Sequence, residues 1–93
     1  MFGLSNEIIG KINNITNKYS KTFVLFGSRA RGDYKKNSDI DIAIIEETEQ
    51  NEKYKIMNEF DELDIAYKID LIFIQDIQNE NFIKEIKKDG IKI

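Results

Sequence analysis

The sequence contains no cysteine and no histidine. Without cysteine, the chain can form no disulfide, no thiol nucleophile and no thiolate metal site. Without histidine, it lacks the commonest general base and the commonest zinc ligand. Any catalysis must therefore use carboxylates, hydroxyls, Lys, Arg, Tyr or a hard metal ion held by oxygen ligands.

A basic surplus and long apolar runs are also missing. The net charge of −3 argues against nucleic acid as a partner, because proteins that bind nucleic acid usually carry an excess of Lys and Arg. No apolar run approaches the ~20 residues of a membrane span. The amino terminus lacks the cationic stretch and apolar segment of a signal peptide. We therefore expect a cytoplasmic protein with no membrane association.

The 93 residues are enough for one domain, which we assign to residues 1–93. Apolar residues at helical spacing predict helices over residues 5–19, 49–64 and 79–90, with Ser5 as an N-cap and Gly90 as a C′ residue. Apolar runs predict strands over residues 22–26, 39–46 and 67–75, and residues 91–93 are expected to form a short edge strand. Strands that alternate with helices indicate an α/β or α+β domain with two or three layers. Tyr54, Met57 and Phe60 are expected in the core.

Two aspartates interrupt the second apolar strand, in the stretch Asp39-Ile40-Asp41-Ile42. Residues i and i+2 of a strand point to the same face, so the two carboxylates share a face while the isoleucines take the other. At 5 Å and an effective dielectric near 20, two such charges repel by about 3 kcal/mol. A bound cation removes this repulsion, and Mg²⁺ prefers carboxylate oxygens.

A third aspartate, Asp70, interrupts the third apolar strand. If strands 39–46 and 67–75 are neighbours, Asp70 can join Asp39 and Asp41, and three carboxylates suffice for a two-metal phosphoryl-transfer site. The alternative is that these aspartates face solvent on an open side of the sheet, or that Asp39 is only a turn residue.

The turn at Gly27-Ser28 follows a buried strand and precedes a short helical segment, an arrangement that suits anion binding. Gly27 permits close approach of a phosphate, and the Ser28 hydroxyl can add a hydrogen bond. Arg29 and Arg31 could neutralise phosphate charge. Because residues two apart in a helix do not share a face, we expect at most one of them to contact a nucleotide and the other to fix the local fold.

These residues together resemble a known signature. Gly27-Ser28-Arg29-Ala30-Arg31-Gly32, followed eleven residues after Ser28 by Asp39-Ile40-Asp41, is similar to the motif of the polymerase-beta-like nucleotidyltransferase superfamily, and especially of its minimal nucleotidyltransferases (MNT proteins). The resemblance implies that superfamily's fold, a small mixed β-sheet flanked by helices. It also implies Mg²⁺-dependent transfer of a nucleotidyl group from ATP or another NTP to a hydroxyl.

Carried over residue by residue, the resemblance implies that Gly27 and Ser28 hold the β/γ-phosphates. It implies that Asp39 and Asp41 coordinate two metal ions, and that Asp70 binds the catalytic metal and helps to deprotonate the attacking hydroxyl. In this sense all three aspartates are catalytic and metal-binding candidates, and Arg29 and Arg31 are candidate nucleotide ligands.

The resemblance also implies a partner. Many minimal nucleotidyltransferases are encoded beside a helical protein of the HEPN or substrate-binding type, and some resemble antitoxins that add AMP to a tyrosine of a HEPN toxin. We therefore expect a hetero-oligomer with a helical partner from a neighbouring gene, which would supply the acceptor hydroxyl. The alternative is a non-catalytic binding module that neutralises or scaffolds the partner by complex formation.

Overall fold

The computed structural model describes all 93 residues and contains one four-stranded sheet. Its elements are α1 (Asn6–Thr16), β1 (Phe23–Phe26), α2 (Ser28–Arg31), β2 (Ile40–Ile44), α3 (Gln50–Asp61), β3 (Ile69–Phe73), a 3₁₀ turn (Ile74–Asp76), α4 (Glu80–Asp89) and β4 (Ile91–Lys92). The strand order is β3-β2-β1-β4. The β2–β3 pair is parallel, and β1 is antiparallel to both β2 and β4, so the sheet is mixed as expected.

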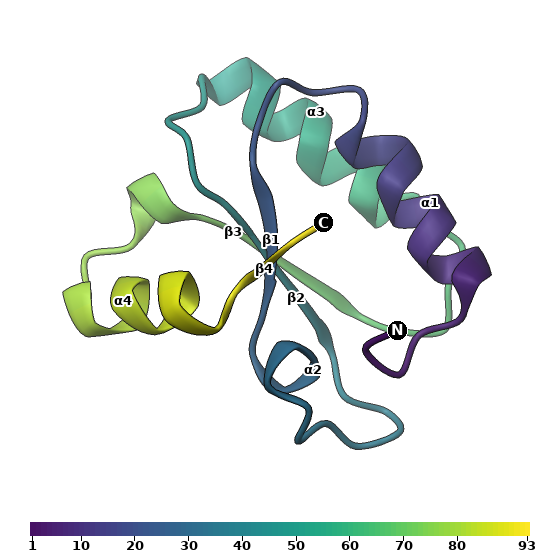
Figure 1. The fold of residues 1–93 in the computed structure, drawn as a ribbon. Coiled ribbons are helices and arrows are strands. Elements are labelled where there is room, and N and C mark those ends of the chain that lie inside the picture. The colour runs from purple at the N-terminus through teal and green to yellow at the C-terminus, as the bar shows by residue number, and fades with distance from the viewer.

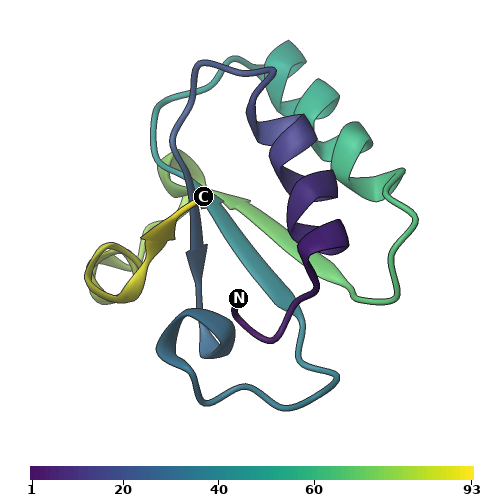
Figure 2. The same ribbon diagram turned by 45° about the vertical axis from the view of Figure 1, so that its right-hand side comes forward.

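Helices cover both faces of the sheet. In Figures 1 and 2, α1 and α3 lie side by side on one face, while α4 lies on the other. The sequence sets this division, because Ile40, Ile42 and Ile44 point from β2 into the larger core beneath α1 and α3. Ala43 points the other way and packs with Phe26 and Ile86 of α4. All four residues of β1 are buried, which confirms the prediction of a strand covered on both faces.

Most predicted element boundaries are correct within a few residues. The Ser5 side chain caps α1 by accepting a hydrogen bond from the Ile8 N–H. The predicted edge strand is present as β4, although it pairs over only two residues. The parallel pairing of β2 with β3 confirms that the two aspartate-bearing strands are neighbours.

Two structural predictions were wrong. Gly90 ends α4 with a φ of −66° instead of the left-handed conformation of a C′ glycine, because the chain continues directly into β4. Glycine is needed there for space, since a Cβ would lie 2.2 Å from Val24 Cγ1. Tyr54 and Met57 are exposed, because α3 turns only the face with Ile56 and Phe60 to the sheet.

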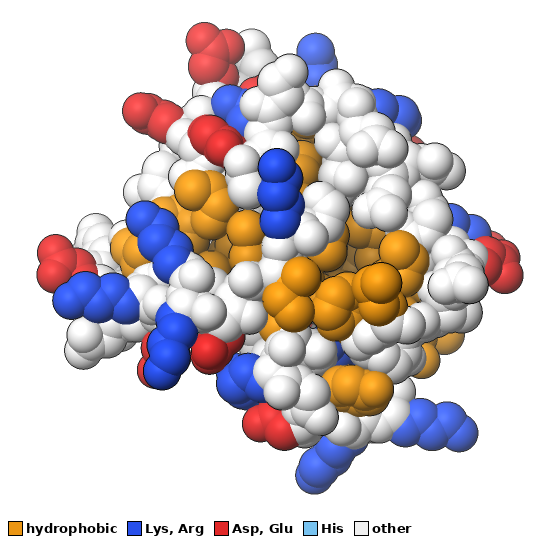
Figure 3. Space-filling model, in the orientation of Figure 1, with side chains coloured by type: hydrophobic (Ala, Val, Ile, Leu, Met, Phe, Trp, Pro, Cys, Tyr) orange, Lys and Arg blue, Asp and Glu red, His pale blue; other side chains and the backbone are white.

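Apolar side chains also gather on the surface between the two chain termini, on the face seen in Figure 3. They border a hollow of about 410 Å³ beside β4, on the α1 side of the sheet. Its apolar lining residues are Met1, Phe2, Leu4, Ile9, Ile12, Leu25, Ile91 and Ile93. The longest helix, α3, has 12 residues, and no helix has the length and hydropathy that a membrane span requires.

Candidate active site

Three side chains form a row across the sheet on the face covered by α4. Phe26 of β1 pairs with Asp41 of β2, and Asp41 in turn pairs with Asp70 of β3. The parallel register of β2 and β3 therefore places the carboxylates of two strands next to each other, as adjacent paired residues are in a sheet. The alternation of β2 turns Asp41 away from the larger core, as the sequence predicts.

A cavity of about 560 Å³ opens over this row. Its volume is within the range of small-molecule sites. It is bounded by the sheet, by the turn after β1 and by the inner face of α4. The lining residues are Phe26, Gly27, Ser28, Arg31, Asp41, Asp70, Leu71, Ile72, Phe82, Glu85, Ile86 and Asp89. Five of the seven predicted site residues thus meet in one cavity.

Gly27 lies directly against the Asp41 carboxylate. A Cβ at position 27 would be 2.3 Å from Asp41 Oδ2, so the Asp41 carboxylate or the turn would have to move. The backbone at Gly27 also has φ 75° and ψ −155°, a conformation that is essentially restricted to glycine. The turn therefore brings its backbone close to the carboxylate because it carries no side chain there.

The electrostatics of Asp41 reflect this crowding. Burial raises the pKa of the Asp41 carboxyl, and the negative charges of Asp70 and Asp39 raise this pKa further. The Arg31 guanidinium acts in the opposite direction and lowers the pKa. A bound cation would relieve the repulsion that Asp41 experiences from its two neighbours.

The three aspartates are not equally placed. Asp39 precedes β2 and is not among the residues that line the cavity. Asp70 lines the cavity, and its Oδ1 lies 3.4 Å from Lys68 Nζ. No three acidic side chains lie close enough together to hold one metal ion. A metal site formed by all three aspartates therefore stays a prediction.

Asp41 and Asp70 nevertheless fit Mg²⁺ by the chemistry of their donors. Mg²⁺ is usually held by one or two carboxylates, several waters and the phosphates of its substrate, without a complete protein cage. Asp41 and Asp70 are two neighbouring carboxylates, and the pKa of Asp41 is raised by burial and by the charges of Asp70 and Asp39, so the pair matches this requirement. The carboxylate oxygens of Asp41 and Asp70 would be the protein ligands that line the cavity.

The two arginines have different positions. Arg31 is exposed and lines the cavity, where its charge can meet a phosphate. Arg29 is only 2% exposed and lies outside the cavity lining. Its guanidinium donates to the backbone carbonyls of Phe2, Lys36 and Ser38 and stacks against the rings of Tyr34 and Tyr67. Arg29 thus fixes the loop that leads to Asp39, and the structure does not place it as a nucleotide ligand.

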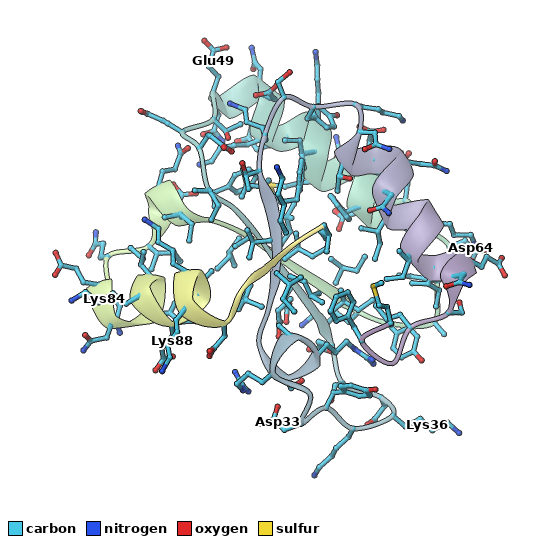
Figure 4. The ribbon with its side chains drawn as sticks, viewed as in Figure 1. Asp33, Lys36, Glu49, Asp64, Lys84 and Lys88 are labelled. Atoms are coloured by element: carbon cyan, nitrogen blue, oxygen red, sulfur yellow. The ribbon has the colours of Figure 1, made fainter.

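The inner face of α4 contributes Phe82, Glu85 and Asp89 to the cavity, a role that no motif in the sequence had indicated. Helical spacing carries the signal: these residues lie at i, i+3 and i+7, on the same side as the buried Ile86. The lysines take the outer face instead, and Figure 4 shows Lys84 and Lys88 pointing away from the sheet.

Comparison with known proteins agrees with this arrangement. A family model described as "Polymerase beta, Nucleotidyltransferase" matches residues 10–93. The chain therefore belongs to the polymerase beta nucleotidyltransferase family, and it is a nucleotidyltransferase with the fold that the sequence predicts.

Individual similar proteins give more detail than the family match. The "Putative protein adenylyltransferase MJ1379" of Methanocaldococcus jannaschii is 38% identical in an alignment 93 positions long, which covers 94% of this chain and 92% of that protein. A crystal structure of a toxin-antitoxin with AMP-PNP is similar with a TM-score of 0.65 and 22% identity, over 95% of this chain and 72% of the other. A mutant of the toxin-antitoxin MntA-HpeT has a TM-score of 0.60 and 22% identity, over 96% and 72% of the two chains. Because both solved structures are only 22% identical to this chain, their similarity shows a shared fold and is not evidence of a shared function.

Proposed function

We propose that this protein transfers AMP from ATP, with Mg²⁺, to a hydroxyl group supplied by a helical partner protein. The observation that carries the proposal is the contact of the Gly27 turn with Asp41 in the same cavity as Asp70, Ser28 and Arg31. In this cavity a candidate phosphate-binding turn lies next to two carboxylates that could hold Mg²⁺ for phosphoryl transfer. The relative named as a protein adenylyltransferase supports AMP as the transferred group.

In the proposed reaction the acceptor oxygen attacks the α-phosphorus of ATP. The bond from this phosphorus to the bridging oxygen breaks, and pyrophosphate leaves. Mg²⁺ would supply charge neutralisation for the phosphates and for the developing charge on the leaving group. Gly27 and Ser28 would bind the β/γ-phosphates, and Arg31 would add a positive charge. Asp39, Asp41 and Asp70 would hold the metal ions. Asp70 would take the proton of the attacking hydroxyl, since the chain has no histidine to do so.

The cavity charge supports the requirement for a divalent cation. Asp41, Asp70, Glu85 and Asp89 face one arginine in the lining, so the lining carries three more negative than positive groups. A nucleoside triphosphate adds further negative charge, and Coulomb repulsion would oppose its binding without metal ions.

A partner would provide the acceptor. The four α-helices pack against the sheet or border the cavity, and none of them forms a separate unit that could bind an acceptor. Two similar solved structures are toxin-antitoxins, which supports a hetero-oligomer with a partner protein. We propose that this partner is a helical toxin of the HEPN type encoded by a neighbouring gene, as the resemblance to minimal nucleotidyltransferases implies. In this proposal the acceptor is a tyrosine hydroxyl of that toxin.

The test is a transfer assay with ATP labelled at the α-phosphate, Mg²⁺ and the helical protein of the neighbouring gene. We expect label on a partner tyrosine with the wild-type protein and none with Asp41→Asn. No transfer by the wild type, or equal transfer by the variant, would refute the proposal.

Toxin rescue separates catalysis from binding. A variant in which Asp39, Asp41 and Asp70 are all replaced by Asn should still bind the partner in a pull-down but should not rescue cells from the toxin. Full rescue by this variant would instead favour a protein that neutralises its partner by complex formation alone.

A further inference from the structure

The lining of the active-site cavity contains both polar and apolar side chains. The polar or charged residues are Gly27, Ser28, Arg31, Asp41, Asp70, Glu85 and Asp89, and the apolar residues are Phe26, Leu71, Ile72, Phe82 and Ile86. A nucleoside triphosphate also has two kinds of surface, since a flat, largely apolar base is joined through a sugar to charged phosphates. If the phosphates lie at the Gly27 turn, the apolar residues of α4 are available to contact the base.

Phe82 has the properties of a stacking surface. It lines the cavity and remains 36% exposed, although a phenylalanine on the inner face of a helix is normally buried. Its ring is held in place by an edge contact with the buried Phe26, with centroids 6.0 Å apart and ring planes at 75°. The other exposed aromatic residues, Tyr34 and Tyr54, do not line this cavity.

Glu85 lies one helical turn after Phe82 and lines the same cavity. It is exposed, and none of the ion pairs of the structure involves it. An ionised carboxylate only accepts hydrogen bonds. It can therefore bind the exocyclic amino group of a base, whereas a ring carbonyl in the same position would be repelled.

We propose that Phe82 stacks against the nucleobase and that Glu85 accepts a hydrogen bond from the exocyclic amino group of that base. The proposal rests on the proposed function, because it assumes that a nucleoside triphosphate occupies the cavity. It adds a base specificity: ATP binds better than inosine triphosphate, in which a carbonyl replaces the amino group of adenine.

Calorimetric titration with MgATP and with inosine triphosphate plus Mg²⁺ tests this without any acceptor. We expect the wild-type protein to bind ATP about tenfold more tightly, which corresponds to ~1.4 kcal/mol. Phe82→Leu should weaken the binding of both nucleotides about 5- to 150-fold, the loss of one stacking contact. Phe82→Trp should retain affinity, and Lys84→Ala, on the outer face of α4, should change neither titration.

Glu85→Gln is the second variant, and it replaces an exposed side chain and so leaves folding intact. Because an amide both donates and accepts, we expect the affinities for the two nucleotides to converge within about threefold. Equal binding of both nucleotides by the wild type, or unchanged affinity in Phe82→Leu, would overturn the inference while leaving the proposed function in place. If the wild type binds no nucleotide at all, the proposed function itself fails.

Discussion

Gly27 connects the backbone conformation of the turn to the chemistry of the site. Its positive φ and its contact with Asp41 leave no room for any other residue. The same turn orients Ser28 and Arg31 toward the cavity. At the scale of single residues, the site thus depends on a missing side chain as much as on the carboxylates.

Replacing Gly27 by Ala should damage stability and activity together. The strained φ and ψ should cost about 1–3 kcal/mol in the free energy of unfolding. The added Cβ should also displace the Asp41 carboxylate, so nucleotidyl transfer should fall at least tenfold. Urea unfolding and the transfer assay measure the two effects.

Gly10→Ala is the matched control. Gly10 lies inside α1, where a Cβ would meet nothing within 4 Å. Alanine is favoured over glycine in a helix by roughly 1 kcal/mol, so this variant should be more stable and equally active. A stable and active Gly27→Ala protein would contradict the assigned role of the turn.

At the scale of elements, the sequence predicted which segments are helices and strands because their apolar spacing is regular. The sequence did not predict the role of Gly90, because its small size matters only where β4 folds back beside Val24. Nor did it separate Arg29 from Arg31, because the two residues differ only in their tertiary contacts. The spacing of residues along the chain predicts which side chains of a helix or strand point in the same direction. It does not predict which other element those side chains contact, because that element can be distant in sequence.

Arg29 links α2 to the loop before Asp39 and to the amino-terminal segment. Arg29→Lys should lower the free energy of unfolding by about 1–3 kcal/mol, because a single ammonium cannot replace all the hydrogen bonds that the guanidinium donates to partly buried carbonyls. Thermal unfolding followed by circular dichroism measures the loss. Arg31→Lys, at an exposed position, should change stability by less than about 0.5 kcal/mol. Equal effects of the two changes would contradict the structural role of Arg29.

Tyr19, which follows α1, is joined to α3 by a hydrogen bond from its hydroxyl to the Glu59 carboxylate. Burial, this hydrogen bond and the charges of Glu59 and Glu52 raise the pKa of Tyr19 to about 12. The neutral phenol therefore stabilises the fold fully below pH 10, and this contribution is lost as the pH rises toward 12.

Tyr19→Phe should be less stable than the wild type by about 1 kcal/mol at pH 8, the usual contribution of one hydrogen bond. The difference between the two proteins should shrink as the pH rises from 10 to 12. Urea unfolding of both proteins across this range measures it. A difference that does not change with pH would show that the phenol is not stabilised in its neutral form.

At the scale of the whole molecule, the site forms where three strands and two helices meet. The sequence predicted the Gly27 turn and the aspartates because their spacing is distinctive. The contribution of α4 to the cavity was not predicted, because α4 is distant in sequence from the Gly27 turn and contains no recognisable motif. The parallel pairing of β2 and β3, which sets Asp41 beside Asp70, could be expected but not established before the register was known.

The central claim is that Asp41 and Asp70 bind a nucleoside triphosphate through Mg²⁺ in the cavity beside the Gly27 turn. Calorimetric titration of ATP into the wild-type protein and Asp41→Asn, each with Mg²⁺ and with EDTA, tests it most directly. Because burial and neighbouring charges raise the pKa of Asp41, a neutral Asn should leave the fold intact. We predict binding by the wild type with Mg²⁺ only, and at least tenfold weaker binding by Asp41→Asn. Equal binding in EDTA, or by the variant, would contradict the claim.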